Sequence, residues 1–118
     1  MRKIEAHKVN PTNDKIEIIV LDNPGHGGAN HIYNVELPDG DITEISFQNG
    51  PIAEAGINGL TQEVLLAIVV DRLRAFQAGP YSCRENALAL TKIEEAQHWL
   101  HSRTRARMGR DVEGTSKI

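Results

Sequence analysis

The residues of this chain best suited to bind an anion are three arginines in its C-terminal part. Arg103, Arg107 and Arg110 are separated by four and three residues, a spacing that places them along one face of a helix. Guanidinium groups arranged in this way can hold phosphate oxygens through paired, charge-assisted hydrogen bonds. The same spacing fits a solvated helix end, where positive side chains complement the negative pole of the helix dipole. Spacing alone leaves both interpretations open.

Two further side chains have the chemistry that a nucleotide ligand requires. Phe76 falls near the end of an expected helix and is either a core ring or a stacking platform for a purine. Asn86 falls one turn into the next expected helix and is either an ordinary surface residue or a group that recognises a base edge or a ribose. Trp99 is expected to pack rather than to bind a ligand.

The remaining reactive residue types give little support for catalysis. The five histidines form neither a zinc-protease motif nor the context of a nucleophile elbow. His98 and His101 have a spacing that could share a metal, but solvent-facing or hydrogen-bonded histidines are favoured without a third ligand. The His26–Gly28 loop lacks the spacing of a phosphate-binding loop, and Cys83 is expected to fill a first helical turn. We therefore expect no enzyme activity, no cofactor and no metal.

Composition and charge limit the class of protein. The chain has 118 residues, of which 40% are hydrophobic and 25% charged, enough for one modest core. Its single cysteine excludes an internal disulfide, and its apolar runs are shorter than a membrane span. The formal net charge is −3, with nine acidic and four basic residues in 1–60 but seven and nine in 61–118. A basic patch on an acidic protein suits a small anionic ligand better than nucleic acid, and a soluble intracellular protein is expected.

The first half of the chain has the pattern of a small antiparallel sheet. A β-branched run and two alternating runs predict strands, and the Pro38–Gly40 turn between the latter predicts a hairpin. A segment rich in glycine and proline predicts a loop. The expected strands are Lys15–Leu21, His31–Leu37 and Asp41–Gln48, with a further edge strand in Met1–Val9 and the loop at Asn23–Asn30.

The second half has the pattern of two long helices after one helical turn at Ile52–Ile57. Thr61 is an expected N-cap for a helix over Gln62–Gln77, which is apolar nearly all round and therefore predicts a partner subunit. Ser82 has the spacing of a capping box before a helix over Cys83–Arg107. The apolar seam of that helix is expected at Leu90, Ile93, Gln97 and Leu100, and Met108–Ile118 is expected to be a tail unless another chain holds it. The fold class is α+β, a sheet followed by a helical hairpin.

Several segments together resemble the phage-encoded Thoeris anti-defence sponge proteins of the type-one family, which share a helical-hairpin domain with an anti-CBASS sponge family. The similarity covers about residues 30–116. The matching segments are Ile45–Gly59, Asp71–Gln77, Arg84–Leu90, Glu94–Leu100, Arg103–Arg107 and Val112–Thr115.

The resemblance implies a binding protein without turnover. Such sponges sequester cyclic ADP-ribose isomers made by bacterial Thoeris TIR proteins, and they form multimers, often hexamers built from dimers, with nucleotide pockets between subunits. The family's signal pocket uses a phenylalanine, an asparagine and an arginine that fall on Phe76, Asn86 and Arg103. Gln77 and Arg107 complete the expected ligand-binding set.

Some family members also hold cyclic di- or trinucleotides at separate sites between subunits, for which Arg105 and Thr115 are the candidates here. The resemblance further implies one sponge domain over residues 1–118, with a sheet part at 1–50, a hairpin at 51–110 and a tail at 111–118. It places the protein in the cytoplasm of the infected host, without nucleic-acid or membrane partners. The alternatives are a signal-degrading enzyme and a nucleic-acid-binding accessory protein that uses the arginine face.

Overall fold

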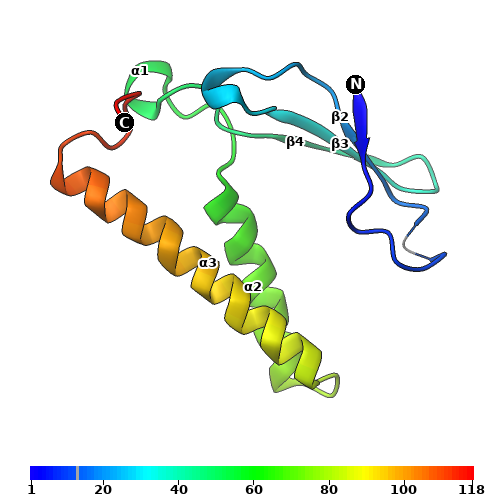
Figure 1. Cartoon of the computed structure of the whole chain (residues 1–118). Helices are drawn as coiled ribbons and strands as arrows, with labels where there is room; N and C mark the ends of the chain where they lie inside the picture. The colour runs from blue at the N-terminus through cyan, green and yellow to red at the C-terminus, as the bar shows by residue number, and fades with distance from the viewer. Residues whose placement is uncertain (13) are drawn as a thin grey trace. The chain divides into compact units, whose positions relative to one another are not determined.

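The computed structural model describes residues 1–12 and 14–118 and has the predicted α+β class. The chain forms two compact units, Met1–Leu60 and Thr61–Ile118. The first unit holds an antiparallel sheet of order β1-β2-β3-β4, and the second holds two long helices. Both units are drawn in Figure 1, and each is described below by itself.

The sheet follows the predicted strands, which are shorter in the structure at their ends. The predicted hairpin is confirmed, with Tyr33 opposite Ile45 in the register and the Asp39 carboxylate accepting a hydrogen bond from the Asp41 N–H in the turn. Gly40 has φ +94°, which favours glycine in this turn. The strands are β1 (Arg2–Ile4), β2 (Glu17–Val20), β3 (Ile32–Glu36) and β4 (Ile42–Ser46).

One face of the sheet carries the core of the first unit. Because side chains alternate along a strand, Val20 shares this face with its register partner Tyr33. Val20 is the most deeply buried of the described side chains, and the Tyr33 ring meets the Phe47 ring edge-on at 5.6 Å between centroids. The predicted loop at Asn23–Asn30 is confirmed and contains one 3₁₀ turn, η1 (His26–Gly28).

A compact turn closes the first unit after β4. The short helix α1 (Ile52–Ala55) forms one turn within the segment where a helical turn was expected. Gly59 then passes so close to β4 that a Cβ there would lie 2.5 Å from the Phe47 carbonyl carbon, so only glycine fits. The Gln48 side chain donates to the Gly56 carbonyl at 2.7 Å and accepts from the Asn58 N–H at 3.0 Å.

The second unit is the predicted helical hairpin. Helix α2 (Gln62–Ala78) begins at Thr61, whose hydroxyl accepts a hydrogen bond from the Val64 N–H as expected for an N-cap. Helix α3 (Arg84–Gly109) begins one residue later than predicted, and its N-cap is Cys83. The capping box from Ser82 is therefore wrong, because the Cys83 thiol accepts the Asn86 N–H at 3.4 Å in place of a serine hydroxyl.

The two helices pack along a regular stripe of half-buried residues. The predicted seam of α3 is confirmed, and the stripe continues beyond it in both directions at steps of three and four residues. Val70 is the one fully buried residue of α2. The stripe of α3 comprises Asn86, Leu90, Ile93, Gln97, Leu100, Thr104 and Arg107, and that of α2 comprises Leu66, Val70, Leu73 and Gln77.

The segment after α3 is not a free tail. Val112 is buried, and the Arg107 side chain of the same chain holds the carbonyl groups that follow. The expectation that only another chain would order this segment is therefore wrong.

Candidate functional site

The turn between α2 and α3 carries a small aromatic and cationic cluster. Phe76 lies in the last turn of α2 and is partly exposed. The Arg72 guanidinium lies 5.3 Å from the centre of the Phe76 ring, and the Tyr81 ring lies at 6.5 Å with a tilt of 58°. Tyr81 is 72% exposed. A flat base could stack on this cluster, and a guanidinium beside it supplies positive charge for a phosphate.

Asn86 lies on the other side of the same turn, in the first turn of α3. Its backbone N–H bonds to Cys83, while its side-chain amide has no hydrogen-bond partner among residues 1–12 and 14–118. The side chain is half-buried on the stripe that faces α2. An amide held in this way can donate and accept at once toward a ligand at the turn.

Gln77 is also at the turn, but its side chain is engaged within the chain. Its Nε2 donates to the Cys83 carbonyl and its Oε1 accepts from the Cys83 N–H, both at 3.1 Å. The amide therefore has both of its hydrogen-bonding functions directed at the backbone of one residue. The structure places Gln77 beside Phe76 and Asn86 without pointing its amide at an open site.

Arg103 lies far from this turn. It is exposed, and it follows Asn86 by 17 positions of continuous helix, which corresponds to about 25 Å along α3. One small cyclic nucleotide cannot touch both residues in the same chain. The structure therefore brings Phe76, Gln77 and Asn86 together and leaves Arg103 at the other end of the hairpin.

Arg107 is the centre of a clasp that orders the segment after α3. The residue is 7% exposed. Its Nη2 donates to the carbonyls of Val112 at 2.9 Å and Thr115 at 3.1 Å, and its Nη1 donates to that of Lys117 at 2.8 Å. Its Nε bonds to the Glu113 carboxylate at 3.2 Å. A guanidinium used in this way has no N–H group aimed at solvent.

The predicted arginine face is therefore divided. Arg107 is buried, Arg110 has left the helix as the C-cap of α3 and donates to the Ile118 carbonyl at 2.7 Å while remaining exposed, and Arg103 is exposed on the helix. Arg105 is exposed as well. The Thr115 hydroxyl donates to the Val112 carbonyl at 2.5 Å. Of the two second-site candidates, only Arg105 presents its polar group to solvent.

The structure also places the aromatic and histidine residues of α3. Trp99 is 69% exposed and does not pack into this chain's core; its ring meets the His98 ring edge-on at 5.2 Å. His101 is exposed on the same helix. In the part of the chain that the structure describes, no three metal-ligating side chains come together, and no helix has both the length and the apolar character needed to cross a membrane.

Arg72 and Tyr81, the guanidinium and ring neighbours of Phe76, were not among the residues predicted from the sequence. Arg72 had a detectable signal, since residues four apart on a helix lie on the same face. Tyr81 had none, because its position depends on the path of the turn through Gly79 and Pro80.

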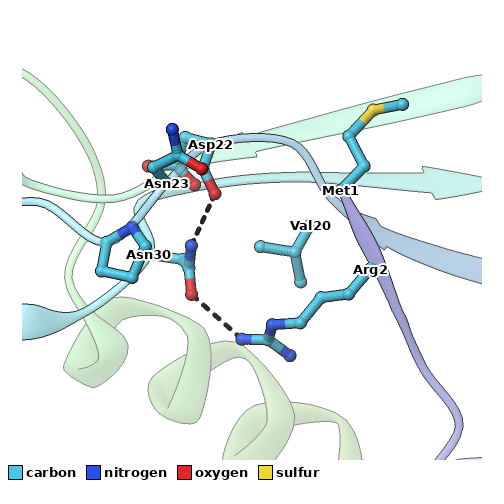
Figure 2. A pocket seen from close by; sticks show the side chains of 7 residues that line it. Met1, Arg2, Val20, Asp22, Asn23 and Asn30 are labelled. Atoms are coloured by element: carbon cyan, nitrogen blue, oxygen red, sulfur yellow. Dashed lines mark hydrogen bonds between the residues drawn. The ribbon is translucent and has the colours of Figure 1, made fainter.

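A separate cavity of about 210 Å³ lies in the first unit, lined in part by Met1, Arg2, Val20 and Asn30. Figure 2 shows the Arg2 guanidinium bonded to the Asn30 side chain, which in turn donates to the Asp22 carbonyl. None of the predicted ligand-binding residues lines this cavity. At one wall the Arg2, Asn30 and Asp22 polar groups bond to one another.

Electrostatics in the first unit support its loops. Burial raises the pKa of the Asp22 carboxyl, but hydrogen bonds from the His31 and Ile32 N–H groups outweigh it, and the net pKa lies below the ordinary value. A hydrogen bond from Lys8 lowers the pKa of Glu17, and the same contact raises the pKa of Lys8. These groups stay charged at neutral pH and hold the loops beside the sheet.

Comparison with known proteins gives the family. A family model described as the Acb2/Tad1 hairpin domain matches residues 39–105, which include Phe76, Asn86 and Arg103 but exclude Arg107 and Thr115. The chain is 46% identical over 91 residues to Thoeris anti-defense 1 of Bacillus phage SBSphiJ7. That match covers 77% of this chain and spans only 64% of the relative's length. The match over more than half of the sequence shows that this chain belongs to the Acb2/Tad1 hairpin domain family.

Proposed function

We propose that this chain is a phage anti-Thoeris protein that binds cyclic ADP-ribose isomers made by Thoeris TIR proteins and sequesters them without degrading them, in the cytoplasm of the infected host. The family match and the name of the 46% identical relative support the class of protein. The geometry of the α2–α3 turn supports the kind of ligand, because it combines a stacking ring, a cation and the Asn86 side-chain amide.

The observation that carries the proposal is the separation of the ligand-binding residues. Phe76 and Asn86 lie at the turn, while Arg103 lies about 25 Å away along α3. If all three contact one small ligand, Arg103 must come from a second copy of the chain. The proposed site therefore lies between subunits, with the turn of one copy facing the distal part of α3 of another.

Apolar side chains on the hairpin offer the surface that such an assembly needs. Ile68 of α2 is 55% exposed, and Val64 and Leu88 are exposed as well. Trp99 adds a large ring on α3. Covering these side chains removes apolar area from water, at about 25 cal/mol per Å². This exposure supports a homo-oligomer, and a hexamer built from dimers is the expected form.

Sequestration sets the affinity that the proposed contacts must reach together. Stacking of adenine on the Phe76 ring contributes about 1–3 kcal/mol by analogy with single-strand binding proteins. Guanidinium bonds to the pyrophosphate are charge-assisted, and Arg103 and Arg72 are exposed arginines able to make them. A nanomolar dissociation constant, which a sponge needs to silence a dilute signal, corresponds to about −12 kcal/mol. An enclosed site between subunits provides more of this binding free energy than one open turn, because it contacts the ligand from two sides.

The decisive experiment is complementation between two variants. Phe76→Ala and Arg103→Ala are each expected to weaken binding of the TIR-made cyclic ADP-ribose isomer while keeping the oligomer. Subunits of the two variants are then mixed by unfolding and refolding together. A site between copies predicts that mixed oligomers regain intact sites, because some turns then meet an unaltered Arg103. Native mass spectrometry reports the subunit count and the ligand mass in one measurement.

Matched controls and contrary results follow from the same design. Arg105→Ala removes an exposed arginine two residues away and is expected to leave binding of this signal unchanged. If mixing restores no binding, Phe76 and Arg103 do not share a site between copies. Ligand released by heat should have the mass of the intact cyclic molecule, and a cleaved product would favour the signal-degrading enzyme. A retarded DNA band with steep salt dependence would favour the nucleic-acid alternative.

A separate site for cyclic di- or trinucleotides is a second proposal, supported by the exposed Arg105 on the face of α3 outside the stripe. Arg105→Ala is expected to weaken uptake of a cyclic dinucleotide while cyclic ADP-ribose uptake persists. Thr115, whose hydroxyl bonds to Val112, would have to release that bond to contact a ligand. Competition between the two ligand classes for a single site would contradict this proposal.

A further inference from the structure

The contact between Gln77 and Cys83 is the most specific polar feature of the α2–α3 turn. Two hydrogen bonds of 3.1 Å run in opposite directions between one side-chain amide and one backbone residue. This arrangement, here called the turn clip, imitates the pairing of two antiparallel strands. It connects the last turn of α2 directly to the N-cap of α3, across a loop that includes Gly79 and Pro80.

Both ends of the turn clip adjoin residues of the proposed ligand site. Gln77 follows Phe76 in the chain, and the Gly79 N–H bonds back to the Phe76 carbonyl at 3.2 Å. Cys83 accepts the Asn86 N–H and so fixes the first turn of α3. The separation of the Phe76 ring from the Asn86 amide is thus set by a short path through Gln77 and Cys83.

The N-cap of α3 is weak, so the first turn of this helix depends more on the turn clip for its stability. A thiol is a poor hydrogen-bond acceptor compared with the hydroxyl, amide or carboxylate groups that usually cap helices. The Cys83 Sγ contact to Asn86 is 3.4 Å long. The start of α3 therefore depends on the two bonds from Gln77 more than it would behind a serine or aspartate.

We infer that Gln77 is a positioning residue for the ligand site: it sets the relative placement of Phe76 and Asn86 through Cys83 and does not itself contact the ligand. This inference rests on the proposed function. The alternative is a direct ligand contact, for which the amide would have to break both bonds to Cys83. A purely structural clip is the other alternative, and it would alter folding without altering affinity.

Glutamine is suited to this task because it donates and accepts at once at neutral pH. A glutamate carboxylate of the same length cannot donate to the Cys83 carbonyl and repels it, and this repulsion draws the side chain away from Cys83, so that the bond from the Cys83 N–H is weakened as well. Once protonated, the carboxylic acid has one donor and one acceptor again. In Gln77→Glu the turn clip is therefore lost at neutral pH and restored when the carboxylate is protonated. In Gln77→Leu it is lost at every pH.

The test measures two quantities on the full chain: affinity for the TIR-made cyclic ADP-ribose isomer, and hydrogen exchange at the Cys83 N–H by NMR, expressed relative to the intrinsic exchange rate at the same pH. Gln77→Leu is expected to accelerate this exchange and to weaken binding by about tenfold, the equivalent of one to two lost hydrogen bonds. Gln77→Glu should do the same at pH 7.5 and recover both properties as the pH falls toward 4.5. Gln62→Leu and Gln62→Glu, at an exposed position in the first turn of α2, are the matched controls.

Each contrary result has a distinct meaning. Weaker binding of Gln77→Leu with unchanged exchange at Cys83 would show a direct ligand contact and overturn the inference. Faster exchange with unchanged affinity would show a clip that positions nothing. If Gln77→Leu fails to fold, the behaviour of Gln77→Glu at low pH still tests the inference. Affinity that stays weak while protection of the Cys83 N–H recovers would overturn it. A wild-type chain that ignores the isomer would instead refute the proposed function, whatever the exchange rates.

Discussion

The two ends of the α2–α3 hairpin use similar polar side chains for different purposes. At the turn, Arg72 and Tyr81 surround an exposed Phe76 ring, and the Asn86 amide has no partner within the described residues. At the opposite end, the Arg107 guanidinium is buried and bonded to the chain's own carbonyls. The two ends therefore differ: an amide that has no partner within the described residues lies at the turn, and a guanidinium that is bonded to its own chain lies at the opposite end.

The difference shows that residue type and helical spacing do not suffice to identify a ligand-binding arginine. Arg103 and Arg107 lie one turn apart, yet one is exposed and the other is buried under the segment that follows α3. The family match ends at residue 105, so it includes Arg103 and excludes Arg107. We expect substitutions at the turn to change binding and substitutions at the clasp to change stability.

The largest effect is expected at the clasp. Arg107→Ala leaves the carbonyls of Val112, Thr115 and Lys117 without their donor and should lower the free energy of unfolding by about 3 kcal/mol. Urea unfolding measures this change. The exposed Arg105→Ala is the matched control and should stay within about 0.5 kcal/mol of wild type. Equal free energies of unfolding for the two variants would show that the Arg107 hydrogen bonds do not stabilise this end of the hairpin.

The next effect is expected at the turn. Phe76→Ala should weaken binding of the TIR-made cyclic ADP-ribose isomer by about 2 kcal/mol, because the stacking surface is lost. Fluorescence of the single tryptophan, Trp99, or calorimetry measures the affinity. Tyr81→Phe keeps the neighbouring ring and is the matched control, with near wild-type affinity expected. A stability loss in Phe76→Ala as large as that of Arg107→Ala would mean that the ring is a core residue after all.

A smaller effect is expected between the two ends, where the Arg74 guanidinium meets the Glu94 carboxylate at 2.7 Å across the helices. Both side chains are substantially exposed, so Arg74→Ala should cost less than about 1 kcal/mol of stability. Added salt should reduce the cost further. The exchanged pair, Arg74→Glu with Glu94→Arg, should recover part of it, and a failure to do so would show that the pair contributes nothing measurable.

The smallest effect is expected on acidification, and it should appear in the first unit before either hairpin end. Hydrogen bonds from His31 and Ile32 outweigh burial and lower the pKa of Asp22. A lowered pKa means that the stabilisation is complete above the ordinary aspartate value of about 3.9 and is lost as the pH falls through the lower folded value. The protection of the Ile32 N–H against exchange, measured by NMR relative to the intrinsic exchange rate at each pH, should therefore be constant from pH 7 to 5 and fall only below about pH 4. Asp22→Asn should abolish that fall.

The sequence by itself determined the local elements and the family. The β-hairpin around Pro38–Gly40, the Thr61 cap and the seam of α3 follow from turn chemistry and from the periods of two and 3.6 residues, which act between near neighbours in the chain. The resemblance assigned Phe76, Asn86 and Arg103 to one signal pocket, and this assignment stays a prediction; in the structure Phe76 and Asn86 flank the α2–α3 turn, and Arg103 lies far along α3.

Only the tertiary structure decided what each polar side chain contacts. Gln77 bonds to Cys83, and Arg107 bonds to carbonyls as far as ten residues later. Such contacts depend on the path of a turn or of an irregular segment, and no periodic pattern encodes that path. Spacing could place Arg103, Arg107 and Arg110 on one face, but the folding of residues 111–118 over that face determined which guanidinium groups stay exposed.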